Sequence, residues 1–166
     1  MRRMTALLSL AAIVLWTIGA SAQAKPSFAG KWTREAPAGG AAPAGGGGGG
    51  RGGGGGGGFC GAECTITQSA TELTLEYVGG GQNPAPMKQV YKLDGSVSKN
   101  PGRGGADVES KATWDGAKLV ITTTTQNGEQ KRVLSLEGGN LVVDATNPGR
   151  EGAAPTTTKI TFKKAA

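Results

Sequence analysis

The stretch from Trp114 to Ala145 constrains the fold of this chain more than any other part. It contains three runs of β-branched and apolar residues, separated by Asp115-Gly116, by Asn127-Gly128 and by Gly138-Gly139-Asn140. Such runs between short Gly-containing turns are typical of antiparallel strands joined by tight hairpins. The stretch therefore predicts a three-stranded meander, and a fold for the whole chain has to contain one.

Within this meander, alternation predicts which side chains face the core. The expected inner face comprises Leu119, Ile121, Val133, Leu141 and Val143. Leu134 and Leu136 alternate against Val133, so the facing of the strand over 131–136 stays open between two alternatives.

Further alternating segments flank the meander. Phe28, Gly30 and Trp32 share one face of a first strand, and the other expected strands cover 65–68, 73–77, 87–93, 108–114 and 157–163. No segment after the N-terminal apolar run shows the 3.6-residue period of a helix. Closing the sheet removes its exposed edges. We therefore expect an all-β fold, an antiparallel up-and-down barrel of 8–9 strands.

The N-terminus has the pattern of a secretory signal peptide. Arg2 and Arg3 precede an apolar run over 6–18, which is followed by two A-x-A cleavage sites within 20–24. The run is shorter than the roughly 20 residues of a membrane-spanning helix, so no membrane span is expected. The sequence predicts a signal peptide over 1–24, a single domain over 25–166, and export to the periplasm or the extracellular space.

A glycine-rich insert follows the first strand, over 36–58. From Gly45 to Gly58 it is broken only by Arg51, and it has no apolar side chain to offset the entropy of ordering. We expect a flexible, disordered insert, either a tolerated expansion of a surface loop or a mobile flap. One arginine without interleaved aromatic residues does not make a nucleic-acid site, so no nucleic-acid partner is expected.

Two cysteines, Cys60 and Cys64, come directly after this insert. In an exported protein, cysteines this close predict a disulfide that closes a small loop. The alternative is a thiol metal site or a redox pair. However, the C-x-x-x-C spacing differs from that of redox motifs, and the chain has no histidine to complete a zinc site. Neither a metal nor a cofactor is expected.

One short sequence occurs twice between strands. The segment Asn100–Ala106 matches Asn147–Ala153 at six of seven positions, and both open with Asn-Pro-Gly, which favours a turn. With nine strands running up and down, these two loops share one rim, and the glycine insert and the cysteine loop lie at the other. Arg103 and Arg150 are then either solvated loop residues or a basic rim that attracts an anion.

The opening Gly30-Lys31-Trp32 resembles the G-x-W of lipocalins and related calycin barrels. More narrowly, the run from Tyr91 through Asn100-Pro101-Gly102-Arg103 and Trp114-Asp115-Gly116 to Thr122 is similar to small secreted bacterial proteins of unassigned function. This resemblance implies a lipocalin-like barrel. Fatty-acid-binding relatives carry an arginine and a tyrosine near the end of the last strand. This chain has Lys159-Ile160-Thr161-Phe162 there, so the resemblance does not extend to a fatty-acid carboxylate site.

Four aromatic residues are candidates for the interior: Trp32, Tyr77, Tyr91 and Trp114. An eight-stranded barrel is just wide enough to be filled by side chains or to hold one small ligand. We expect an exported barrel that binds a small apolar or amphipathic molecule through these four residues together with Arg103 and Arg150. The alternative is a structural or interaction protein of the cell envelope, with a solid core and no ligand. Enzymatic activity is not expected, because the chain has no histidine and its acidic residues fall mostly in turns or outward positions.

Overall fold

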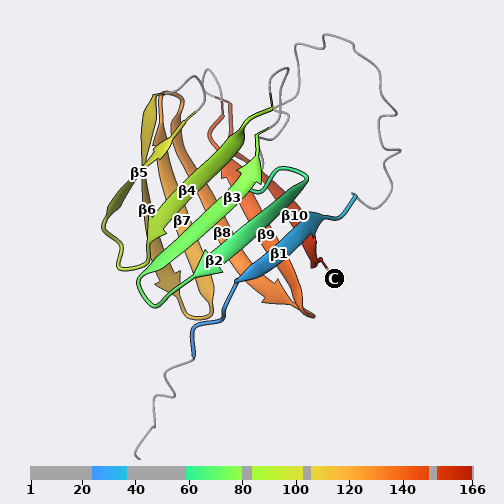
Figure 1. Ribbon diagram of the computed structural model, residues 1–166. Helices are drawn as coiled ribbons and strands as arrows, with labels where there is room; N and C mark the ends of the chain where they lie inside the picture. Colours follow the sequence, from blue (N-terminus) through green and yellow to red (C-terminus); the bar gives the residue numbers. More distant parts are fainter. Residues whose placement is uncertain (1–23, 37–58, 80–83, 103–105, 150–152, 166) are drawn as a thin grey trace, which may run out of the picture.

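The computed structural model describes residues 24–36, 59–79, 84–102, 106–149 and 153–165. The signal peptide except Ala24, most of the glycine-rich insert, and both Arg103 and Arg150 lie outside the described residues. Within those ranges the chain forms ten strands and no helix (Figure 1). They are β1 (Gly30–Arg34), β2 (Glu63–Gln68), β3 (Glu72–Val78), β4 (Pro86–Lys92), β5 (Val97–Pro101), β6 (Asp107–Asp115), β7 (Lys118–Thr125), β8 (Gly128–Glu137), β9 (Asn140–Asn147) and β10 (Thr156–Lys164).

All ten strands belong to one antiparallel sheet. Its order is β4-β3-β2-β1-β10-β9-β8-β7-β6-β5, so the first and last strands of the chain pair in the middle of the sheet. Sequential neighbours pair everywhere except between β4 and β5, the two edges. Figure 1 shows the sheet curling until these edges face each other. The predicted all-β, antiparallel up-and-down barrel is confirmed.

The strand count differs from the expected eight or nine because no strand was expected between the segments over 87–93 and 108–114. Val97–Pro101 is instead strand β5, which pairs with β6 from Val97↔Lys111 to Pro101↔Asp107. The inward positions of β5 hold the polar residues Ser98 and Asn100, so the segment lacks the apolar alternation that reveals the other strands.

The additional strand also moves the predicted rims. The connections after β1, β3, β5, β7 and β9 all lie at one end of an up-and-down barrel, which we call the cysteine end. The segments around Arg103 and Arg150 therefore approach the same end as the cysteine loop, and the expectation of opposite rims is wrong. Consistent with this, a Cβ atom added at Gly128, the first residue of β8, would lie 3.2 Å from Pro148 after β9.

The seam between β4 and β5 is closed by side chains. Asn100 accepts a hydrogen bond from the Val90 N–H through Oδ1 (2.7 Å) and donates one to the Val90 carbonyl through Nδ2 (3.0 Å). Ser98 Oγ accepts from the Lys92 N–H (2.9 Å). The amide of Asn100 thus takes the place of a paired strand's backbone. An open hollow of about 400 Å³ runs along this seam, lined by Val90, Lys92, Val97, Ser98 and Lys99.

The core lies inside the barrel and corrects one predicted facing. Leu134 is fully buried and pairs with Leu119 on β7 and Val143 on β9, which are also fully buried. Val133, expected inside, pairs instead with Asp144 on the outer face. The expected inward positions of Leu119, Ile121, Leu141 and Val143 are confirmed. Because alternate residues share a face, the corrected register turns Arg132 inward as well.

The end opposite the cysteine loop is closed by the segment before β1, and we call it the Phe28 end. The ring of Phe28 is fully buried and stacks on Trp114, with centroids 5.9 Å apart. The Phe28 N–H donates to Gln68 Oε1 (2.8 Å), and Gln68 Nε2 donates to the Pro26 carbonyl (3.1 Å). Trp32 Nε1 donates to the Phe28 carbonyl (2.8 Å). Three hydrogen bonds and one ring contact therefore hold this closure in place.

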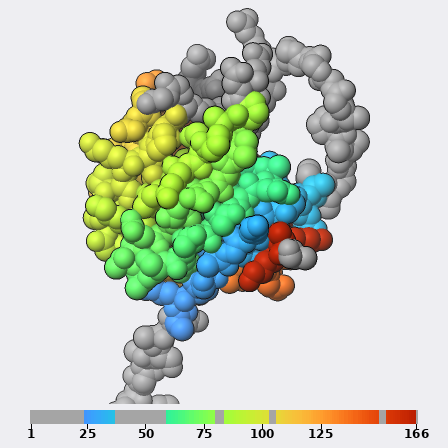
Figure 2. All heavy atoms as spheres, viewed as in Figure 1, coloured from blue at the N-terminus to red at the C-terminus, as the bar shows by residue number. Residues whose placement is uncertain are grey.

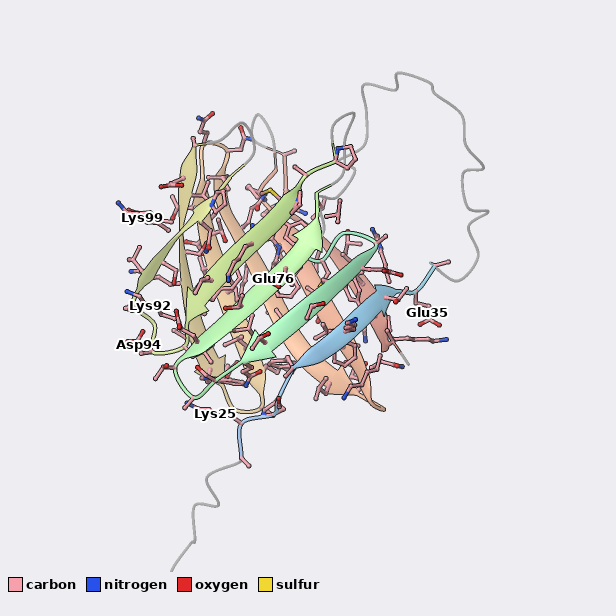
Figure 3. All side chains as sticks on the ribbon, in the orientation of Figure 1. Lys25, Glu35, Glu76, Lys92, Asp94 and Lys99 are labelled. Carbon is pink, nitrogen blue, oxygen red and sulfur yellow. A yellow bond between two sulfur atoms is a disulfide. The ribbon has the colours of Figure 1, made fainter. Side chains whose placement is uncertain are left out.

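Charged side chains cover the outer face. The exposed ion pairs in the described ranges are Lys88–Glu76, Lys99–Glu109, Lys159–Glu137 and Lys163–Glu35. Figure 2 shows the atoms of β1 to β4 as one continuous face, and in Figure 3 its side chains project away from the ribbon into solvent. Across the described part of the chain, no helix has the length and apolarity needed to cross a membrane.

Candidate functional site

The barrel interior combines an apolar wall on β9 and β10 with inward positions on β4 to β8 that are partly polar. The inward positions of β9 and β10 carry Leu141, Val143, Ile160 and Phe162, all buried. The inward positions of β4 to β8 include a set of polar residues, namely Gln89, Tyr91, Ser98, Asn100, Ser110, Thr123 and Arg132. Ser110 and Thr123 satisfy each other through a buried hydrogen bond of 2.9 Å. Most of these polar groups bond to one another or to the backbone of β4. We call this polar set the polar sector, and it shares the interior with the apolar wall of β9 and β10.

Among the arginines in the described ranges, Arg132 is the one that the register places midway along an inner face. It lies on β8 between Ile121 and Ala145, its inward-facing partners on β7 and β9, and it is half-buried. Within the described residues, no carboxylate lies within salt-bridge distance of its guanidinium. Arg132 thus brings a cation into the barrel without a carboxylate partner from the described part of the chain.

Tyr91 is a buried inward-facing tyrosine whose ionisation is influenced by this cation. It is 1% exposed, and its hydroxyl donates to Gln89 Oε1 at 2.6 Å. Burial raises the pKa of Tyr91 from 10.0 to about 12, an effect that the positive charge of Arg132 opposes and the neighbouring Tyr77 reinforces. Tyr91 is therefore neutral at physiological pH, and its hydroxyl can still accept a hydrogen bond.

Tyr77 brings the second tyrosine to the same region. It faces inward on β3, opposite Cys64 on β2 and Met87 on β4, and it is half-buried. An open hollow of about 370 Å³ adjoins it, lined by Glu76, Tyr77, Val78, Pro86, Met87 and Lys88. Because β3 ends and β4 begins here, this hollow lies at the cysteine end of the barrel.

The cysteine loop lies over both tyrosines. The predicted disulfide is confirmed: Cys60 and Cys64 are bonded, with Cα atoms 5.2 Å apart, and both are buried. The ring of Phe59 stacks on Tyr91, with centroids 6.4 Å apart, and is 2% exposed. The loop therefore covers the polar sector with an aromatic side chain.

The predicted aromatic site residues separate into two groups. Tyr77 and Tyr91 come together near Arg132, whereas Trp32 and Trp114 belong to the Phe28 end. Trp32 and Tyr91 are buried, and Tyr77 and Trp114 are half-buried.

At the Phe28 end, Lys25 Nζ lies 5.4 Å from the centroid of the Trp114 ring, and Figure 3 shows Lys25 at that end. The Trp114 Nε1 is buried, with no acceptor in the described part of the chain. Arg103 and Arg150 lie outside the described residues, so their predicted role as a basic rim stays a prediction.

Sequence reasoning missed Arg132 and Phe59. The signal for Arg132 was present, because taking Leu134 and Leu136 as the inner residues of β8 places Arg132 on the same face. Phe59 had a weaker signal, an apolar residue directly before Cys60 in a stretch otherwise rich in glycine. The described residues contain no group of three or more His, Cys, Asp or Glu side chains that could hold a metal ion.

Comparison with known proteins supports the barrel architecture. No protein-family model matches this chain, and no curated protein matches it either. Among solved structures, it is similar to zebrafish ileal bile acid-binding protein complexed with cholic acid, with 20% identity and a TM-score of 0.50, over 62% of this chain and 72% of that one. The wild-type fluorescent protein UnaG shares 19% identity at a TM-score of 0.49, over 62% and 72% of the two chains. At 20% identity the likeness to the bile acid-binding protein concerns the fold alone, and it agrees with the antiparallel barrel described above.

Proposed function

We propose that this chain is an exported binding protein that takes up a small amphipathic molecule and holds its polar or anionic group at Arg132 and Tyr91. The carrying observation is the inward position of Arg132, which has no carboxylate within salt-bridge distance in the described residues and lies near a buried, neutral tyrosine. A guanidinium offers planar, forked donors that suit carboxylates and phosphates.

The apolar wall supports the second half of this proposal. Leu141, Val143 and Ile160 present hydrocarbon surface inside the barrel, and burial of a ligand's apolar part there contributes affinity in proportion to the area removed from water. The structurally similar ileal bile acid-binding protein was solved with cholic acid, itself an amphipathic anion.

Two features support export and a binding rather than an enzymatic role. The leader pattern over 1–24 and the Cys60–Cys64 disulfide both suit an oxidising compartment, periplasmic or extracellular. The chain also has no histidine, the commonest general base, and the proposed site consists of groups that bind and orient.

The proposal is tested by comparing dodecanoate with dodecanol, which share an apolar chain and differ in charge. We expect the protein to prefer dodecanoate, and Arg132→Met to weaken dodecanoate binding by about tenfold or more while leaving dodecanol binding nearly unchanged. Calorimetric titration of the mature protein measures both affinities. Lys131→Met is the matched control, because Lys131 is the adjacent cation on the outer face. Equal binding of dodecanoate by the wild type and Arg132→Met would contradict the assigned role.

The alternative function, a structural or interaction protein with a solid core, is favoured by a different observation. Phe28 and Phe59 each fill one end of the interior, and the two hollows described above lie at the seam and at the rim. Native mass spectrometry of the protein after exposure to a lipid extract separates the two candidates. Retention of no small molecule, together with no binding of either probe, favours the solid-core function.

A further inference from the structure

Phe59 occupies the part of the interior that the proposed ligand needs. Its ring stacks on Tyr91 at 6.4 Å with an angle of 26° between the planes, and it belongs to the same buried cluster as Leu75 and Ile121. Tyr91 in turn is close enough to Arg132 for the guanidinium to influence its ionisation. An apolar group bound next to Arg132 and Tyr91 would therefore meet the phenyl ring of Phe59.

Gly61 brings the same loop against the second tyrosine. A Cβ atom added at Gly61 would lie 2.9 Å from the Val78 carbonyl oxygen and 3.7 Å from the Tyr77 ring. Only a residue without a side chain allows this close approach of backbone to backbone. The loop consequently packs directly on the end of β3.

The disulfide ties the loop to the barrel wall at its base. Cys64 faces inward on β2, and Cys60, directly after Phe59, is bonded to it and fully buried. The Ala62 carbonyl also accepts a hydrogen bond from the Arg34 N–H on β1 (2.8 Å). Phe59 is therefore carried on a short, covalently anchored loop, while its contacts inside the barrel are those of a single side chain.

We propose that Phe59 is a built-in stopper, which fills the place beside Tyr91 that the apolar part of the ligand takes and which the ligand has to displace on binding. This inference rests on the proposed binding function and adds how access to the site is controlled. The Cys60–Cys64 disulfide holds the stopper at the entrance, so that Phe59 returns when the site empties.

The stopper also sets which molecules bind. A ligand replaces contacts that Phe59 already makes, so a purely apolar molecule no larger than a phenyl ring gains little by entering. A molecule with an anionic group gains the interaction with Arg132 in addition. The stopper thus favours larger amphipathic ligands over small apolar ones.

A first measurement needs no ligand. The sequence contains two tyrosines, so in a Tyr77→Phe background the spectrophotometric titration reports Tyr91 alone. Adding Phe59→Ala should admit water to Tyr91 and lower its pKa from about 12 toward the ordinary 10.0. Gly61→Ala should lift the loop while keeping Phe59, which provides a second variant if Phe59→Ala folds poorly. Phe28→Ala removes the same side chain at the other end and should leave the pKa of Tyr91 unchanged.

A second measurement uses dodecanoate as the probe, with Tyr77 intact. We expect Phe59→Ala and Gly61→Ala to raise its affinity about tenfold or more over the wild type, and Phe28→Ala to leave it unchanged. Cys60→Ala/Cys64→Ala should raise it as well, because the loop is no longer anchored.

The outcomes separate this inference from the proposed function. A raised affinity together with a lowered pKa supports the stopper. The stopper is overturned, and the proposed function stands, if Phe59→Ala and Gly61→Ala bind dodecanoate as the wild type does and binding still depends on Arg132. The same holds if the pKa of Tyr91 is unchanged in both of these variants. A lowered pKa with no dodecanoate bound by any variant overturns the proposed function, and with it the stopper's role in ligand access.

Discussion

The two ends of the barrel are both closed by a phenylalanine, and they differ in how that residue is held. At the Phe28 end, backbone groups of Pro26 and Phe28 bond to Gln68 and Trp32, and the ring stacks on Trp114. At the cysteine end, Phe59 contacts Tyr91 through its ring, and the loop that carries it is anchored by the disulfide and by the hydrogen bond from the Arg34 N–H to the Ala62 carbonyl.

This difference indicates which end of the barrel stays closed and which end can open. Removing the Phe28 segment would leave the amide of Gln68 and the indole N–H of Trp32 without their partners, so that end is built to stay closed. Lifting Phe59 exposes Tyr91 and Arg132, polar groups that water or a ligand can satisfy. The polar sector therefore makes the cysteine end the one that can open at low cost.

The largest expected effect is on stability. We expect Phe28→Ala to lower the free energy of unfolding by about 3–5 kcal/mol, as large-to-small changes at fully buried aromatic sites do. Phe59→Ala should cost less, about 1–2 kcal/mol, because water can fill the vacated space beside polar groups. Urea unfolding followed by circular dichroism measures both. A cost for Phe59→Ala that equals or exceeds that of Phe28→Ala would contradict the comparison.

A second effect concerns alkaline pH, and it arises at Tyr91. The pKa of Tyr91 is raised in the folded state, so the unfolded chain loses this proton first as pH rises. The contribution of Tyr91 to the free energy of unfolding is fully present below pH 10 and is lost between about pH 10 and 12. This contribution amounts to at most about 2–3 kcal/mol.

Tyr91→Phe removes this titration and serves as the control. Its free energy of unfolding should fall less steeply over the same pH range than that of the wild type. Parallel curves for the two proteins would show that Tyr91 is not buried as described.

The smallest effect concerns the seam beside Tyr91. Asn100→Leu removes both hydrogen bonds to the backbone of Val90, which should cost about 1–2 kcal/mol and speed exchange of the Val90 amide. The amide of Phe28, at the other end, should exchange as before. Hydrogen exchange followed by NMR reads both positions, with Asn147→Leu as the matched control, since Asn147 is exposed at the end of β9. Equal acceleration at Val90 and Phe28 would mean that the two ends are not independent.

Much of this architecture was readable from local sequence patterns. The meander over 114–145 follows from alternation and from glycine-containing turns, and Gly116 has the positive φ that such turns require (58°). The Cys60–Cys64 disulfide follows from the close spacing of the two cysteines and from the signal-peptide pattern. The inward position of Tyr91 follows from its place in an alternating strand. These features depend on neighbours along the chain, which a sequence displays directly.

Other features depended on pairing across strands. Strand β5 has polar inward residues whose partners lie on β4, so nothing local to 97–101 marks it as a strand. The facing of Leu134 and Arg132 is decided by Leu119, Ile121 and Val143 on the two adjacent strands, since a shift of one residue would move every side chain of β8 to the other face.

By itself, then, the sequence determined an all-β chain of hairpins with a short disulfide loop, because strands, turns and a close disulfide depend on residues that are near one another along the chain. Only the tertiary structure decided that Phe28 and Phe59 close opposite ends, that Phe59 stacks on Tyr91, and that the two tryptophans contact Phe28 instead. Those placements arise because strands distant in sequence pair and the sheet curls. Residues far apart in the sequence then come together when they lie on the same face of the sheet.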